Sequence, residues 1–180
     1  MHNNLLVINF NKKYFLKVGN KVFRCQIGKG GLKNAKKKVE GDKTTPIGKW
    51  YLESLYYRRD RVLRPKFKKK NILKINQITK NCGWCDDVES IHYNKHIKIS
   101  NFPSLHINHE KLWREDNAYD IMIVISHNKN PTVKNRGSAI FIHCNLSHLE
   151  DTAGCIALKK KDLTFILKNI KDKVCINIKH

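Results

Sequence analysis

Two short apolar runs most constrain how this chain can fold. They are 121–125, Ile-Met-Ile-Val-Ile, and 138–143, Ser-Ala-Ile-Phe-Ile-His. Neither alternates with polar residues, and both are shorter than a typical helix, which favours strands that are covered on both faces. We therefore predict two central, buried strands, with the side chain of His143 at the end of the second.

The rest of the chain also favours strands over helices. Only 160–170 has the helical spacing of apolar residues, whereas 33–43 is polar and basic and is predicted to be a surface loop. Further strand patterns occur at 5–10, 14–18, 21–27, 50–52, 72–75 and 174–178, with Gly19-Asn20 as a hairpin turn. The sequence predicts a mostly β fold, a curved sheet or sandwich with one C-terminal helix, as a single domain over residues 1–180.

The net charge of +21 requires a surface that attracts polyanions. Nucleic acid is one candidate partner and an anionic cell wall is another, but the sequence has no finger, helix-turn-helix or aromatic stacking motif. We expect no specific nucleic-acid binding. Arg58, Arg59, Arg61 and Arg64 form a basic cluster, which is interpreted either as a solvated loop or as a rim that contacts an anionic substrate.

The six cysteines are predicted to be free thiols, because a chain of 180 residues can build a core without disulfides. Cys82 and Cys85 match a redox CxxC pattern, but no βαβ pattern surrounds them. There is no second CxxC pair and no HExxH motif, so no metal site is predicted. No run of 18 apolar residues and no signal-peptide pattern occurs, and we expect a soluble chain without a transmembrane segment.

Cys155 and His143 are the strongest candidates for chemistry. Cys155 follows Gly154, which is suited to a turn that exposes the thiol, and His143 ends a buried strand. A thiol is mostly protonated at neutral pH, so a cysteine nucleophile needs a neighbouring imidazole to accept its proton. The N–H groups of Gly154 and Cys155 are candidates for holding an oxyanion. Taken singly, each side chain also fits a structural role, as a buried thiol and a hydrogen-bonded histidine.

Three segments around these residues resemble the L,D-transpeptidase catalytic-domain family, often called YkuD-like. They are 40–48, Glu-Gly-Asp-Lys-Thr-Thr-Pro-Ile-Gly, 136–143, Arg-Gly-Ser-Ala-Ile-Phe-Ile-His, and 152–158, Thr-Ala-Gly-Cys-Ile-Ala-Leu. Two more blocks match in family order, 83–87 with Tyr93-Asn94, and 109–114 with Tyr119-Asp120. The resemblance spans about residues 25–178 and explains Cys82-Gly83-Trp84-Cys85 as part of a family block.

The resemblance implies a function in peptidoglycan chemistry. Cys155 would take the acyl group of a stem peptide and pass it to an amine of another stem, with His143 as general base and no cofactor. An L,D-carboxypeptidase, in which water replaces the amine, is the nearest alternative. A basic, non-catalytic protein that binds nucleic acid or cell wall is the other. The family works in the periplasm or cell envelope, although the absence of a signal peptide leaves the cytoplasm open, and we expect a monomer.

The chain departs from the commoner family motif beside its cysteine. That motif has Ser-His before Gly-Cys and an arginine shortly after, whereas Thr152-Ala153 and Ala157 occupy those places here. The chain therefore resembles a branch with a shorter spacing between histidine and cysteine. How a stem carboxylate is held, which group orients His143 and which acceptor is used all stay open.

The remaining candidate residues have less specific roles. Arg136, Arg114 and Trp113 are candidates for substrate binding. Each arginine could hold a carboxylate by a bidentate contact, and salt bridges that fix their loops are the alternative. Ser138 is interpreted as a hydroxyl that helps to orient His143. Thr152 is interpreted as an orienting or structural residue of the cysteine turn.

Overall fold

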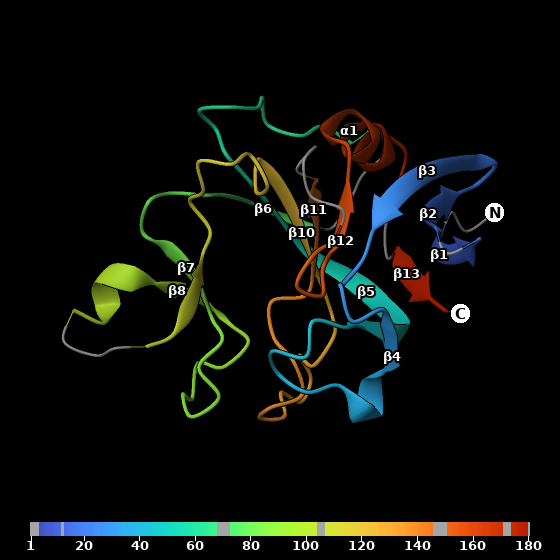
Figure 1. Ribbon diagram of the computed structural model, residues 1–180. Coiled ribbons are helices and arrows are strands. Elements are labelled where there is room, and N and C mark those ends of the chain that lie inside the picture. Colours follow the sequence, from blue (N-terminus) through green and yellow to red (C-terminus); the bar gives the residue numbers. More distant parts are fainter. Residues whose placement is uncertain are drawn as a thin grey trace.

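A computed structural model describes residues 4–11, 13–67, 73–103, 107–145, 151–170 and 174–179. Their strands form two sheets, and the fold is mostly β, as predicted (Figure 1). The larger sheet contains β1 (Leu5–Phe10), β2 (Lys13–Val18), β3 (Lys21–Gln26), β4 (Leu32–Asn34), β5 (Thr45–Tyr57), β6 (Lys74–Gln77), β10 (Ile121–Ile125), β11 (Phe141–Cys144), β12 (Ile156–Leu158) and β13 (Cys175–Ile178). The smaller contains β7 (Cys82–Cys85), β8 (His96–Lys98) and β9 (His109–Lys111). The described helices are α1 (Lys160–Asn169) and the single 3-10 turns η1 (Ala35–Lys37) and η2 (Ile99–Asn101).

The N-terminal hairpin forms as its turn residues predict. Gly19 has a φ of 56°, and Val18 pairs with Lys21 across the turn. Strands β1, β2 and β3 continue through this hairpin into the large sheet, and β3 pairs with β12, which begins directly after Cys155. The hairpin therefore supports the strand that directly follows the candidate nucleophile.

The long strand β5 makes the large sheet curve back on itself. Its first part pairs with β13, from Gly48 to Tyr51, and its second part pairs with β10, from Leu52 to Tyr57. Neighbouring strands follow the order β10, β11, β12, β3, β2, β1, β13 and β5. Because β10 also pairs with β5, the first strand of this path contacts the last. The sequence predicted only residues 50–52 of this strand, because Thr45, Lys49 and Glu53 interrupt its apolar pattern.

Strands β10 and β11 are covered on both faces, which confirms the prediction from their apolar runs. Ile121, Ile123 and Ile125 face a core that also contains Leu163, Ile166 and Leu167 of α1. Met122 and Val124 face a second core on the side of the small sheet, together with Trp84, Phe141 and Cys155. Side chains alternate along a strand, so Phe141 and His143 share the face of β11 that is turned toward this second core.

Residues 33–43 differ from the predicted surface loop. Leu32–Asn34 form β4 parallel to β5, and the side chain of Lys38 is buried although it carries a charge. The Nζ of Lys38 donates to Asp42 and to the carbonyl of Val39, which satisfies the buried ammonium group. Asp42 also accepts from the backbone of Val39 and Thr44, so it organises the turn before β5.

The second apolar run also differs from its prediction, because β11 begins at Phe141 and not at Ser138. Ala139 has a φ of 51°, which is incompatible with a continuous strand. The predicted strand 72–75 is found as β6 from Lys74, and Ile72 lies outside the described residues. The last strand begins at Cys175.

Two members of the basic cluster are structural and do not form a free rim. Arg58 is buried, stacks on Trp113 with its guanidinium carbon 3.4 Å from the ring centroid, and donates to the carbonyl of Arg114. Arg61 forms ion pairs with Glu115 and the buried Asp120. Together they fasten the segment after β9 to the end of β5.

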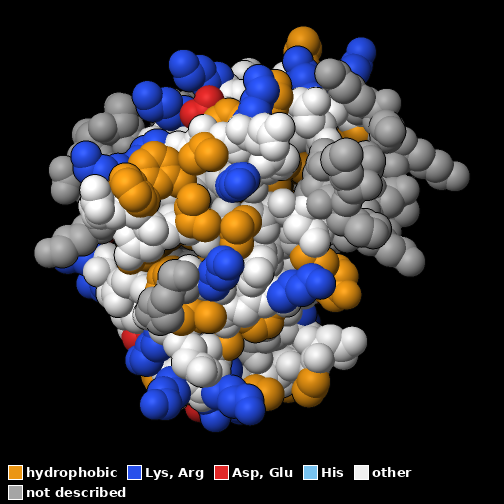
Figure 2. Space-filling model, turned by 90° about the vertical axis from the view of Figure 1, so that its right-hand side faces the viewer, with side chains coloured by type: hydrophobic (Ala, Val, Ile, Leu, Met, Phe, Trp, Pro, Cys, Tyr) orange, Lys and Arg blue, Asp and Glu red, His pale blue; other side chains and the backbone are white. Residues whose placement is uncertain are grey.

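The described surface agrees with a strongly basic composition. Figure 2 shows Lys and Arg side chains spread over one face, with few acidic side chains among them. The six cysteines are free, as predicted. In the part of the chain that the structure describes, no helix is both long and apolar enough to cross a lipid bilayer.

Candidate active site

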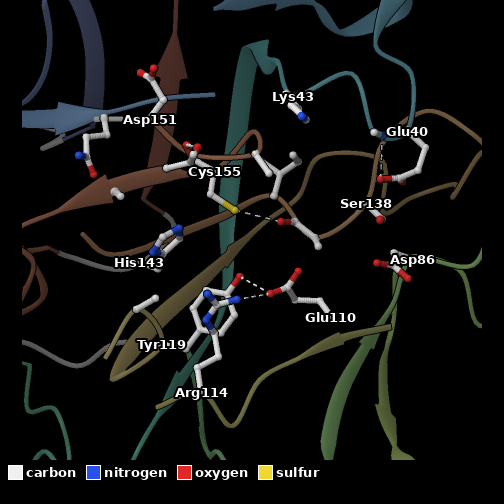
Figure 3. A pocket seen from close by; sticks show the side chains of 18 of the residues that line it. Glu40, Lys43, Asp86, Glu110, Arg114, Tyr119, Ser138, His143, Asp151 and Cys155 are labelled. Atoms are coloured by element: carbon white, nitrogen blue, oxygen red, sulfur yellow. Dashed lines mark hydrogen bonds and ion pairs between the residues drawn. The ribbon is translucent and has the colours of Figure 1, made fainter. Parts of the chain in front are cut away.

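Cys155 and His143 line the same cavity, which has a volume of about 360 Å³ (Figure 3). One side of the cavity comes from the turn before β12 and from β11, and another from β9 and the segment after it. The cavity also borders the loops before β5 and after β7. Its lining residues include Lys38, Glu40, Lys43, Asp86, Glu110, Arg114, Tyr119, Ser138, Ala139, Asp151 and Thr152.

The thiol of Cys155 is held by the backbone that precedes β11. Its Sγ donates to the carbonyl of Ala139 at 3.1 Å and accepts from the N–H of Phe141 at 3.3 Å. The positive φ of Ala139 is part of this arrangement, because it turns the chain just before the strand begins. The thiol is therefore placed in its protonated form at the edge of the cavity.

The imidazole of His143 is oriented by the backbone of the next residue. Its Nδ1 lies 2.8 Å from the carbonyl oxygen of Cys144. A carbonyl oxygen only accepts hydrogen bonds, so Nδ1 carries the proton and Nε2 has a free lone pair. The ring of Tyr119 packs edge-on against the imidazole, with centroids 5.2 Å apart. Figure 3 shows the imidazole and the thiol in the same cavity.

Burial keeps both members of this pair uncharged. It raises the pKa of the Cys155 thiol to about 12, an effect that the N–H of Phe141 opposes. It lowers the pKa of His143 to about 4, against the opposing effect of the hydrogen bond to Cys144. At neutral pH the cavity is therefore lined by a thiol, which can donate a proton, and a neutral imidazole, which can accept one.

Thr152, Gly154 and Thr45 shape the turn that carries the thiol. The Oγ1 of Thr152 donates to the carbonyl of Cys155 at 2.6 Å and accepts from the N–H of Gly154 at 3.1 Å. Gly154 has a φ of 138°, and an added Cβ would lie 3.0 Å from the carbonyl oxygen of Thr44. The buried Thr45 donates from Oγ1 to the carbonyl of Gly154. The N–H of Gly154 is thus already used within the turn.

Arg114 reaches the cavity but is held by two carboxylates. It forms ion pairs with Asp116 and, at 3.0 Å, with Glu110. Glu110 also accepts from the hydroxyl of Tyr119 at 3.2 Å, and this joins the arginine to the residue that packs on His143. Trp113 lines a neighbouring groove and lies under the guanidinium of Arg58.

Arg136 and Ser138 lie away from the imidazole. Arg136 is exposed and is not among the residues that line the cavity, although its backbone carbonyl accepts from His127. Ser138 does line the cavity, but its hydroxyl has no hydrogen-bond partner among the described residues. The contact to Nδ1 of His143 comes from Cys144.

Sequence reasoning missed the role of Asn94. This buried side chain accepts from the N–H of Ala139 and from the indole N–H of Trp84, and donates to the carbonyls of His127 and Asn128. It therefore holds the segment whose carbonyl contacts the thiol. The one sequence signal for this role was that Asn94 belongs to a block that resembles the family. Its position in the sequence did not indicate a contact with the segment that holds Cys155.

Comparisons with known proteins identify the family of this chain. A search of curated proteins found no match. The crystal structure of Mycobacterium tuberculosis L,D-transpeptidase 1 is similar over 97% of this chain and 61% of its own, with 11% sequence identity and a TM-score of 0.39. The chain thus spans about three fifths of the length of that protein. The family model for the L,D-transpeptidase catalytic domain matches residues 3–178, so this chain belongs to the L,D-transpeptidase catalytic-domain family.

Proposed function

We propose that the protein is a cysteine-dependent acyltransferase acting on peptidoglycan stem peptides, with Cys155 as nucleophile and His143 as general base. The observation that carries this proposal is the fixed tautomer of His143. The contact of Nδ1 to Cys144 leaves Nε2 as the basic nitrogen, in a cavity that it shares with the thiol. Family membership supplies the class of reaction.

The first half of the reaction forms a thioester. The Sγ–H bond turns from the carbonyl of Ala139 toward Nε2 of His143, which takes the proton as Sγ attacks the donor carbonyl. The tetrahedral intermediate collapses when the imidazolium returns the proton to the leaving amine. The terminal residue of the donor stem then departs, and the rest of the stem stays on Cys155.

The intermediate needs hydrogen-bond donors for its oxyanion. The N–H of Gly154 already donates to Thr152, so we assign this task to the N–H of Cys155 itself. The hydroxyl of Thr152 makes both of its hydrogen bonds within the turn, so we assign it no further role in the chemistry. Gly154 thus contributes its backbone conformation and its close packing against Thr44.

The second half of the reaction transfers the acyl group. An acceptor amine attacks the thioester carbonyl, and His143 takes a proton from this amine. The C–S bond then breaks, and the imidazolium gives the proton to the departing sulfur, which restores the thiol of Cys155 and the neutral imidazole. Water in place of the amine would give an L,D-carboxypeptidase by the same steps. Peptidoglycan as substrate implies action at the cell envelope, where the positive charge of the protein would hold it near an anionic wall.

Product analysis tests this function and separates its two forms. The protein is incubated with a donor stem peptide, with or without a second stem that has a free amine, and products are identified by mass spectrometry. We expect loss of the donor's terminal residue and, with the acceptor, a new amide that joins the stems. Cys155→Ala should form neither product. Release of the terminal residue with no joined product would assign the carboxypeptidase, and product formation by Cys155→Ala would refute the proposal.

A further inference from the structure

One wall of the active-site cavity is acidic, although the protein as a whole is strongly basic. The sequence has 15 Asp and Glu against 36 Lys and Arg, yet Glu40, Asp86 and Glu110 all line this cavity. They come from different parts of the chain, the loop before β5, the loop after β7 and strand β9. Figure 3 shows the Asp86 carboxylate on the side of the cavity opposite to His143.

Two of these carboxylates have no cation to balance them. Glu110 is paired with Arg114, whereas the described residues form no ion pair to Glu40 or Asp86. Glu40 instead accepts from the hydroxyl of Tyr93, and Lys38 nearby is paired with Asp42. Burial, followed by repulsion from Glu40 and Glu110, raises the pKa of Asp86. A cation that enters the cavity would therefore be the first ion-pair partner of Glu40 and Asp86 among the described residues and would favour the ionised form of Asp86.

Unused hydrogen-bonding atoms lie in the same wall. The hydroxyl of Ser138 is in a side chain that is only 5% exposed, lines the cavity and has no partner among the described residues. The Oδ1 of Asp86 is buried and is likewise unpartnered in the described part of the chain. In the view of Figure 3 the Ser138 oxygen lies between the carboxylates of Glu40 and Asp86. Buried polar atoms are normally paired, so these atoms are available to a polar group that enters the cavity.

We propose that Asp86, Glu40 and Ser138 form a binding subsite for a primary ammonium group of the substrate. This inference rests on the proposed function for its setting, because it assigns a substrate group to the cavity of Cys155. An ammonium group has three N–H donors and no acceptor, and the wall offers oxygen acceptors from each of the three side chains. Its positive charge would offset the two unpaired carboxylates.

Other ligands fit this wall less well. A substrate carboxylate would be repelled by Glu40 and Asp86. Among the described residues, no three His, Cys, Asp or Glu side chains are grouped closely enough to hold a metal ion. A flexible chain that ends in an ammonium group can enter past Asp86, because two neighbouring grooves also border this residue. The ammonium could belong to the donor stem, as a side-chain amine, or to the acceptor before it loses its proton.

Binding is measured first, with no dependence on catalysis. A Cys155→Ala background is titrated with a synthetic stem peptide that contains lysine, and with the same peptide acetylated on the lysine amine. The ammonium peptide should bind more tightly. Asp86→Asn, which keeps the shape of the side chain, should weaken its binding about tenfold and leave the acetylated peptide unaffected. Ser138→Ala should act in the same direction with a smaller loss.

Glu89→Gln is the matched control. Glu89 is an exposed carboxylate paired with Lys134, outside the cavity, and its loss should change neither affinity. If Asp86→Asn does not fold, Ser138→Ala provides the test, since it removes only a hydroxyl. Equal affinities for the two peptides, or equal losses for both in Asp86→Asn and in Ser138→Ala, would overturn the subsite.

Single-turnover kinetics identify the source of the ammonium. If it belongs to the donor, Asp86→Asn slows acylation of Cys155 by the lysine peptide relative to the acetylated one. If it belongs to the acceptor, Asp86→Asn slows consumption of the preformed acyl-enzyme by the amine and leaves its hydrolysis unchanged. Discrimination in binding without acylation of Cys155 would refute the proposed function and retain the subsite. Acylation of Cys155 without discrimination between the two peptides would refute the subsite and retain the proposed function.

Discussion

The Nδ1 of His143 lies 2.8 Å from the carbonyl oxygen of Cys144, the next residue in the chain. The orienting group of this histidine is thus part of its own strand and not a carboxylate side chain. Burial outweighs the stabilising effect of this carbonyl on an imidazolium ion, so Cys155 and His143 rest as a thiol and a neutral imidazole. In the proposed mechanism the proton therefore moves from Cys155 to His143 during the attack and not before it.

The pH dependence of alkylation tests this resting state. Burial raises the pKa of Cys155 to about 12, so its thiolate becomes populated only at high pH. The rate of its reaction with iodoacetamide, followed by peptide mass spectrometry, should still be rising above pH 9. Cys82 is an internal contrast, because hydrogen bonds from His96 and Thr79 outweigh burial and lower its pKa to about 7. A plateau for Cys155 below pH 7 would mean that a thiolate–imidazolium pair is present at rest.

The parts of this site that the sequence predicted are those with local signals. The apolar run that ends at His143 and the glycine before Cys155 mark a buried strand and a turn through their own composition. The resemblance to the family then joined the two. The predicted exposure of the thiol is wrong, because Cys155 is packed in the second core. The buried strands β10 and β11 were predictable for the same reason, since covered strands need no polar alternation.

The missed parts depend on contacts between distant segments. Asn94 holds the backbone of Ala139 across 45 positions, and a polar loop residue gives no sign of such a contact. Arg58 is buried because Trp113 packs against it. The basic residues around Arg58 in the sequence instead predicted that it is exposed. The acidic wall was also unpredictable, because its three carboxylates come from separate segments that only the fold brings together.

Arg58 and its neighbour Arg59 make a matched pair for testing the basic cluster. Arg58→Lys removes the stacking on Trp113 and the hydrogen bond to the carbonyl of Arg114, and lysine cannot replace the planar guanidinium. The free energy of unfolding, measured in urea, should fall by about 1.5–3 kcal/mol. Arg59 is exposed, so Arg59→Lys should change it by less than about 0.5 kcal/mol. Equal effects of the two substitutions would mean that Arg58 is solvated in the same way as Arg59.

Thr45 links the cysteine turn to the start of β5. Its hydroxyl accepts from the N–H of Gly28 and donates to the carbonyl of Gly154, both at 2.8 Å and both buried. Thr45→Val keeps the shape but leaves these groups unpaired, so stability should fall by about 1–3 kcal/mol and acylation should slow. Thr164→Val, on the exposed side of α1, is the control and should preserve both. Unchanged acylation in Thr45→Val would show that the turn holds its shape without this link.

His127 should make the protein less stable in mild acid. Its Nε2 lies 3.0 Å from the carbonyl of Arg136, and its buried Nδ1 has no partner among the described residues. Burial lowers its pKa to about 4, so the unfolded chain takes up the proton first as the pH falls. Stability should therefore decrease from about pH 6.5 to pH 4, by up to about 1.4 kcal/mol per pH unit, and level off below.

The variant His127→Gln isolates this contribution. Glutamine can still donate to the carbonyl of Arg136 but does not titrate. Its unfolding free energy should change less between pH 7 and pH 4 than that of the wild type, although His143, whose pKa is also lowered to about 4, retains its own share. Parallel pH profiles for variant and wild type would exclude His127 as a source of the acid sensitivity.

Site-resolved trapping of the acyl-enzyme tests the central claim most directly. The protein is mixed with a donor stem peptide, quenched in acid within seconds and mapped by peptide mass spectrometry, together with Cys155→Ala, His143→Ala and Cys82→Ala. We expect the donor acyl group on Cys155 alone, in the wild type and in Cys82→Ala. Cys155→Ala should carry none, and His143→Ala should fold but acylate on the order of 10² or more slower. An acyl group on any other residue, or unchanged acylation in His143→Ala, would contradict the assignment of Cys155 and His143.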